Sequence, residues 1–68
     1  MEVCGETHEL VAIRKTRAGH FYLLYDRTHK MFVYLKRRNG VAILYEDAGS
    51  IESDAIHGFK NFIANNII

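Results

Sequence analysis

Residues 30–46 read KMFVYLKRRNGVAILYE, and the pair Asn39-Gly40 divides this stretch into two runs rich in β-branched and aromatic residues. A two-residue type I′ turn needs positive φ at both central positions, and Asn followed by Gly adopts those angles at the least steric cost. The stretch therefore predicts a β-hairpin in which Arg38 faces Val41. The same register pairs Lys36 with Ile43, Leu35 with Leu44 and Tyr34 with Tyr45.

Side chains of a strand alternate between the two faces of its sheet, so this register also predicts which residues share a face. One face is expected to carry Phe32, Tyr34, Lys36, Arg38, Val41, Ile43 and Tyr45. The other is expected to carry Met31, Val33, Leu35, Arg37, Ala42, Leu44 and Glu46. Both faces of the hairpin are thus largely apolar or aromatic.

Two more strands are predicted before the hairpin. Residues 20–26, HFYLLYD, are aromatic or aliphatic almost throughout, which is typical of a central strand buried on both faces. Residues 10–17, LVAIRKTR, begin with a β-branched apolar run and end in charges before the turn residues Ala18-Gly19. Asp26 is expected to begin the next turn, because its carboxylate can accept a hydrogen bond from the backbone two residues on.

A helix is predicted after the hairpin, where apolar residues recur at three- and four-residue spacing. They are Ala55, Ile56, Phe59, Phe62, Ile63 and Ile67. Ser50 or Ser53 is expected to cap the helix, with Glu52 and Asp54 in its first turn. Gly58 costs about 1 kcal/mol relative to Ala inside a helix, and a close approach to the sheet would explain it.

Together these elements predict one α+β domain over residues 1–68. It consists of a small antiparallel β-meander of three to four strands, with one C-terminal helix packed on one face. The 68 residues are 49% apolar and include four Tyr and four Phe, too many for a disordered segment. A chain this short buries only about 60% of its unfolded surface, so its stability is expected to be marginal and a partner would help.

The surroundings of the protein are predicted from its cysteine content and from its hydrophobic segments. A single cysteine, Cys4, excludes an internal disulfide framework, which a secreted chain of this size usually needs. No window approaches the roughly 18 to 20 apolar residues of a transmembrane helix, and the first residues lack the order of a signal peptide. We expect a cytoplasmic protein without a membrane anchor.

Charge is unevenly distributed along the chain. Eight Lys and Arg residues and one acid, Asp26, lie between Arg14 and Arg38, so this stretch carries a net charge of +7. The remaining residues include seven acids and Lys60 alone, which gives −6. The sequence therefore has a basic middle and acidic ends.

One helix covers only one face of such a sheet, so the second apolar face needs another cover. The first hypothesis is a non-enzymatic protein-interaction module, either a homodimer or an adaptor or inhibitor of a larger protein. Tyr, Phe, Met and Arg are enriched in interface cores, and the hairpin carries all four types. The basic middle could also dock on an acidic partner or on the acidic ends of a second copy.

The alternative hypothesis is binding of single-stranded nucleic acid by the same surface. Rings on a sheet stack unpaired bases while neighbouring Lys and Arg neutralise phosphates. Under either hypothesis the predicted binding residues are Phe32, Tyr34, Lys36, Arg38 and Tyr45, helped by Arg14, Lys15 and Arg17. Such residues are also typical of an ordinary core with solvated strand ends.

Enzymatic functions are less favoured by the sequence. It contains no glycine-rich phosphate loop, no Gly-x-Ser-x-Gly elbow and no His-Glu-x-x-His helix. Cys4 and His8 are closely spaced, but structural zinc sites usually need two such pairs, so we predict no metal and no cofactor. A small ribonuclease-like toxin that uses His20, His29 or His57 remains a lesser alternative, because RNA cleavage needs only an acid, a base and a cation.

Overall fold

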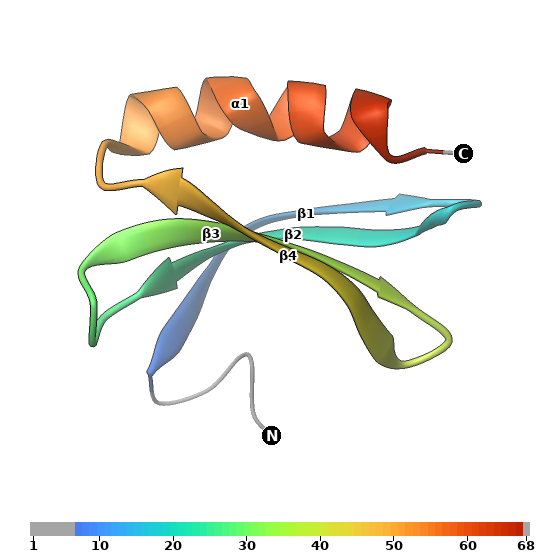
Figure 1. Cartoon of the computed structure of the whole chain (residues 1–68), viewed down its shortest axis with the longest axis horizontal. Helices are drawn as coiled ribbons and strands as arrows, with labels where there is room; N and C mark the ends of the chain where they lie inside the picture. The colour runs from blue at the N-terminus through green and yellow to red at the C-terminus, as the bar shows by residue number, and fades with distance from the viewer. Residues whose placement is uncertain (1–6, 68) are drawn as a thin grey trace.

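The structure is a computed structural model that describes residues 7–67. Its elements are β1 (His8–Thr16), β2 (Gly19–Asp26), β3 (Met31–Arg38), β4 (Val41–Gly49) and α1 (Glu52–Asn65). The four strands form one antiparallel sheet in the order β1-β2-β3-β4, and α1 lies across one of its faces (Figure 1). The α+β meander with a C-terminal helix is therefore confirmed.

Two of the predicted turns have the expected chemistry. Asn39 and Gly40 have φ values of 54° and 79°, the positive angles of a type I′ turn, and Arg38 pairs with Val41. Asp26 begins the β2–β3 turn, where its Oδ1 accepts a hydrogen bond from the Thr28 amide at 2.9 Å. Local sequence thus determines both connections around β3.

Beyond the Asn39-Gly40 turn, the predicted strand register is wrong. The observed pairs are Lys36 with Leu44, Leu35 with Tyr45 and Tyr34 with Glu46. A β-bulge causes the shift, because β4 contains one extra residue, Ile43, between Ala42 and Leu44. One extra residue moves every following side chain to the opposite face, so Tyr34 and Tyr45 lie on opposite sides of the sheet.

β4 contains a further bulge at Ala48, between Asp47, which pairs with Val33, and Gly49, which pairs with Phe32. A third bulge lies in β1. Leu10 pairs with Leu24 and Ala12 pairs with Leu23, so Val11 is the additional residue. The side chains of Leu10 and Ile13 consequently point to the same face, although they are three positions apart.

The main core lies between the sheet and α1. From the sheet it contains Phe21, Leu23, Phe32 and Tyr34, and from the helix Ala55, Phe59, Phe62 and Ile63. Tyr34 stacks on Phe59 and Phe62 with ring centroids 5.9 and 4.9 Å away, and its hydroxyl donates to the Ala55 carbonyl at 2.7 Å. An added Cβ at Gly58 would overlap this hydroxyl, so the expected close approach to the sheet is confirmed.

Other details of the helix differ from prediction. Ile51, and neither Ser50 nor Ser53, occupies the N-cap position, and no side chain caps the helix there. Glu52 and Asp54 do lie in the first turn. On the predicted apolar face Ile56 is exposed, and the exposed Ile67 lies beyond the last helical residue. No helix within residues 7–67 is long and apolar enough to cross a membrane.

Candidate functional site

The sheet face that α1 does not cover, which we call the open face, carries a broad apolar surface. Residues paired across antiparallel strands point to the same face, so the register defines its members. Two neighbouring rows cross the strands at its centre. The first row is Leu10, Leu24, Val33 and Asp47, and the second is Ile13, Tyr22, Leu35 and Tyr45.

The open face is buried at its centre and half exposed at its margins. Leu24, Val33 and Leu35 are almost completely buried and pack with Tyr22. The margins are Leu10, Ile13 and Tyr45, which are 49%, 43% and 51% exposed. The exposed apolar side chains therefore lie along two edges of the face, Leu10 and Ile13 on β1 and Tyr45 on β4, with the buried centre between them.

The two ends of the open face differ in charge. The basic end lies next to the second row, near the β1–β2 and β3–β4 turns. It consists of Lys15, His20 and Arg37, which pair with one another across β1, β2 and β3. The acidic end contains Asp26 and Asp47. Partial burial and the negative charges of these two carboxylates raise the pKa of Tyr45, in keeping with their position on its side of the sheet.

The structure separates the predicted binding residues. Phe32, Tyr34 and Lys36 are buried beneath α1, so they form no free surface together with Tyr45 on the open face. The Lys36 ammonium lies 5.2 Å from the centroid of the Phe21 ring and donates to the carbonyl of Asn66 just after the helix. The Lys36 ammonium therefore binds at the helix C-terminus, where carbonyl groups carry partial negative charge, and does not face a ligand.

The remaining predicted cations lie at one end of the sheet. Arg14 and Lys15 are exposed near the end of β1, Arg17 is in the β1–β2 turn, and Arg38 ends β3. Sequence reasoning missed Leu10 and Ile13 as binding candidates, because only the bulge in β1 places them on one face.

A basic cleft of about 610 Å³ lies where the β1–β2 and β3–β4 turns approach each other. Its lining includes three arginines, Arg17, Arg37 and Arg38, together with His20 and Tyr22. No carboxylate lines it. The Arg37 guanidinium donates to the Gly40 carbonyl at 2.9 Å, which holds this side chain against the β3–β4 turn.

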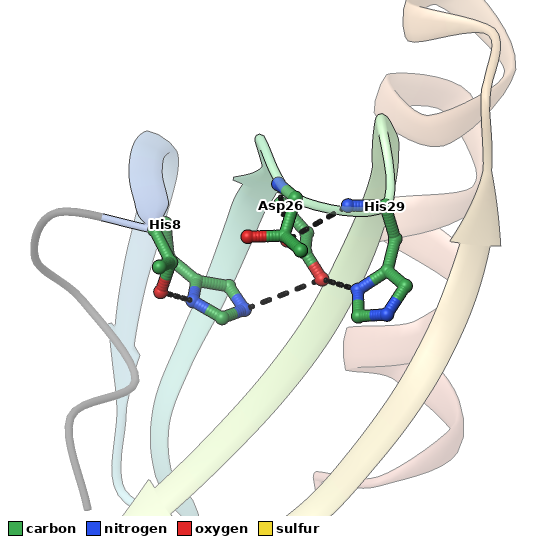
Figure 2. Close-up of polar contacts among 5 residues, drawn as sticks. His8, Asp26 and His29 are labelled. Atoms are coloured by element: carbon green, nitrogen blue, oxygen red, sulfur yellow. Dashed lines mark hydrogen bonds and ion pairs between the residues drawn. The ribbon is translucent and has the colours of Figure 1, made fainter.

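A cluster of titratable groups lies at the opposite end of the sheet, around Asp26 (Figure 2). His29 Nδ1 is 2.7 Å and His8 Nε2 is 3.8 Å from Asp26 Oδ2. Asp26 Oδ1 accepts from the backbone amides of Thr28 and His29 at 2.9 and 3.3 Å. The pKa of Asp26 is lowered, chiefly by the hydrogen bond with the His29 side chain and despite its burial.

These contacts explain the Asp26 cluster as a device that fixes the β2–β3 turn. Both carboxylate oxygens already have partners, and within residues 7–67 no group of three or more His, Cys, Asp or Glu side chains could hold a metal ion. Cys4, the predicted neighbour of His8, lies outside the described residues. His20 and His29 lie at opposite ends of β2, and His57 is exposed on α1, so they do not assemble one acid–base site.

Comparison of the chain with protein-family models, with curated proteins and with solved structures finds no match.

Proposed function

We propose that this chain is a small non-enzymatic protein-interaction module that self-associates through the open face. The observation that supports the proposal is the group of half-exposed apolar residues around a buried centre. Leu10, Ile13 and Tyr45 each leave about half of their surface in water on the face opposite α1. Covering them removes apolar surface from water and stabilises the assembly by roughly 25 cal/mol per Å².

The open face is long and narrow. The molecule measures 30 × 26 × 15 Å along its principal axes, and in the view down the shortest axis α1 lies above the sheet, so the open face spans the 30 Å and 15 Å directions (Figure 1). The sheet is four strands wide, and two such sheets can pack face to face with their strands nearly aligned.

The charges on the open face favour a second copy as the partner. Two copies can stack open face to open face about a two-fold axis that lies between the sheets and is perpendicular to the strands. This rotation reverses the strand direction, so one end of each copy lies over the opposite end of the other copy. The basic end, Lys15, His20 and Arg37, then lies over the opposite end, where Asp47 is the exposed carboxylate. This isologous arrangement satisfies both ends at once, and opposite charges at the rim fix the orientation of the two copies.

Sedimentation velocity tests the proposal, with a pair of variants matched in residue type and exposure. Ile13 on the open face is 43% exposed and Ile56 on α1 is 45% exposed. We expect the wild-type protein and Ile56→Lys to form dimers at tens of micromolar, roughly the range in which a constitutive dimer is populated. We expect Ile13→Lys to be monomeric, because it places a charge in an apolar interface.

The experiment also defines what contradicts the proposal. A wild-type protein that remains monomeric at this concentration excludes self-association as the role of the open face. Equal dissociation of both lysine variants places the interface elsewhere. Circular dichroism spectra that match the wild type show that each variant is folded.

The nucleic-acid hypothesis required the aromatic rings of the hairpin to stack on unpaired bases. Phe32 and Tyr34 are core residues under α1 and are not available to unpaired bases. The positive charge at the turn end of the sheet remains, and the basic cleft gives it a different geometry.

A further inference from the structure

The basic cleft is formed by two segments that are far apart in the sequence. Residues 16–20 of the first hairpin and residues 37–40 of the second lie at the same end of the sheet (Figure 1), and both line the cleft. Gly19 permits this approach, because a Cβ at that position would lie 2.7 Å from the Arg37 carbonyl oxygen. Any side chain at position 19 would therefore push the two hairpins apart.

Positive charge is concentrated in this half of the sheet. Residues 12–22 and 35–45 contain no Asp or Glu, whereas they contain Arg14, Lys15, Arg17, Lys36, Arg37 and Arg38. Within residues 7–67 the ion pairs involve Asp26 and Glu9, at the other end of the strands, and none involves an arginine of the cleft. Three arginines line one cleft, and positive charges gathered in this way attract an anion.

We propose that the basic cleft binds the phosphate group of a nucleotide, either free or within a single strand. A phosphate offers more charge and more acceptor oxygens than a carboxylate, and the planar fork of arginine matches it with paired hydrogen bonds. Arg17 and Arg38 are exposed, and Arg37 is already oriented by the Gly40 carbonyl.

The size of the cleft and its rings indicate a ligand larger than phosphate alone. A volume of about 610 Å³ is within the range of small-molecule sites, which span roughly 300 to 1,000 Å³. His20 and Tyr22 are among the lining residues, and aromatic side chains stack on nucleobases. A single copy of the chain supplies every residue of the cleft, so binding does not require self-association.

Titration monitored by amide chemical shifts tests this inference with four probes. They are inorganic phosphate, adenosine monophosphate, adenosine and a twelve-residue oligothymidylate, a length of roughly one single-strand site. We expect adenosine monophosphate to shift the amides of residues 16–22 and 37–40, and adenosine to leave them unchanged because it lacks the phosphate. Phosphate alone should shift the same amides at higher concentration.

Matched charge variants locate the site. Arg17→Gln and Arg38→Gln should each weaken binding about tenfold, as expected for loss of one charge-assisted hydrogen bond. Lys60→Gln removes the same charge from an exposed position on α1 and should leave affinity unchanged. Arg37 is not used, because its substitution would also remove the contact to the Gly40 carbonyl.

The probes also identify the source of the phosphate. Tighter binding of the oligothymidylate, with a log–log salt slope of about −2 to −3, indicates a single strand that contacts three or four cations. Equal affinity for the mononucleotide and the strand indicates a free nucleotide. Absence of amide shifts with every phosphate-bearing probe at millimolar concentration in low salt, roughly 20 mM, overturns the proposal. Binding that Arg17→Gln and Arg38→Gln do not weaken overturns it as well.

Discussion

Tyr34 is fixed in the core by three different contacts. Its ring stacks on Phe59 and Phe62, its hydroxyl donates to the Ala55 carbonyl, and Gly58 provides the space for that hydroxyl. A buried tyrosine hydroxyl needs such a partner, since an unsatisfied one costs about 1–3 kcal/mol. The helix must therefore come close to the sheet at position 58, and glycine is the residue that allows this.

The first prediction concerns Gly58→Ala. Helix propensity alone would stabilise this variant by about 1 kcal/mol. The new Cβ would overlap the Tyr34 hydroxyl, and forced overpacking of a core costs about 1–3 kcal/mol. We therefore expect a net loss on the order of 1 kcal/mol in the free energy of unfolding, measured by urea denaturation.

The same substitution in a Tyr34→Phe protein shows whether overlap with the Tyr34 hydroxyl causes the loss of stability. In Tyr34→Phe the hydroxyl is absent, and the next atom, Cζ, lies 3.4 Å from the added Cβ, which is nearly ordinary contact. Gly58→Ala should then stabilise the protein, because only the gain in helix propensity remains. Destabilisation of the same size in both backgrounds would mean that Tyr34 is not the obstacle.

At the scale of elements, the turns were predictable and the register was not. Asn39-Gly40 and Asp26 act through local backbone geometry, which is encoded within a few residues. The bulges at Val11 and Ile43 have no comparable local signal, because each depends on packing of neighbouring strands. The predicted binding face failed for this reason, since one extra residue in β4 turned Tyr45 away from Tyr34.

The second prediction tests the turn that begins β4. Gly40 has φ 79°, and an added Cβ would meet no heavy atom within 4 Å, so substitution there perturbs the backbone alone. Gly40→Val forces a β-branched residue to positive φ and should lower the free energy of unfolding by about 1–3 kcal/mol. Thermal unfolding followed by circular dichroism measures the loss.

A control at the neighbouring position keeps the turn chemistry. Asn39 has φ 54°, a region that Asp also tolerates, so Asn39→Asp should change stability by only a few tenths of a kcal/mol. An unchanged melting temperature in Gly40→Val would show that the chain does not depend on a type I′ turn at this site.

In the whole molecule, most of the basic residues in the middle of the sequence lie together at one end of the sheet. The turns of both hairpins lie at one end of the sheet, so Arg17, Arg37 and Arg38 meet around one cleft. The sequence predicted a basic region and an uncovered sheet face, and the structure shows both. It also shows that the basic cleft shares His20, Tyr22 and Arg37 with the open face, and that α1 covers the face on which the rings were expected.

The third prediction links the two proposals, because His20 and Arg37 belong both to the basic cleft and to the basic end of the open face. If the basic end of one copy lies over the acidic end of the other, a nucleotide neutralises the charge that attracts the partner. Saturating adenosine monophosphate should then raise the dimer dissociation constant, and dimerisation should weaken nucleotide binding by the same factor. Sedimentation equilibrium at constant ionic strength measures the effect, with adenosine as the control that lacks phosphate.

The opposite packing, with the two-fold axis along the strands, places basic end over basic end, and there the nucleotide would relieve repulsion and strengthen the dimer. A stronger dimer would thus reverse the proposed orientation, and an unchanged constant at a saturated cleft would show that the two surfaces act independently.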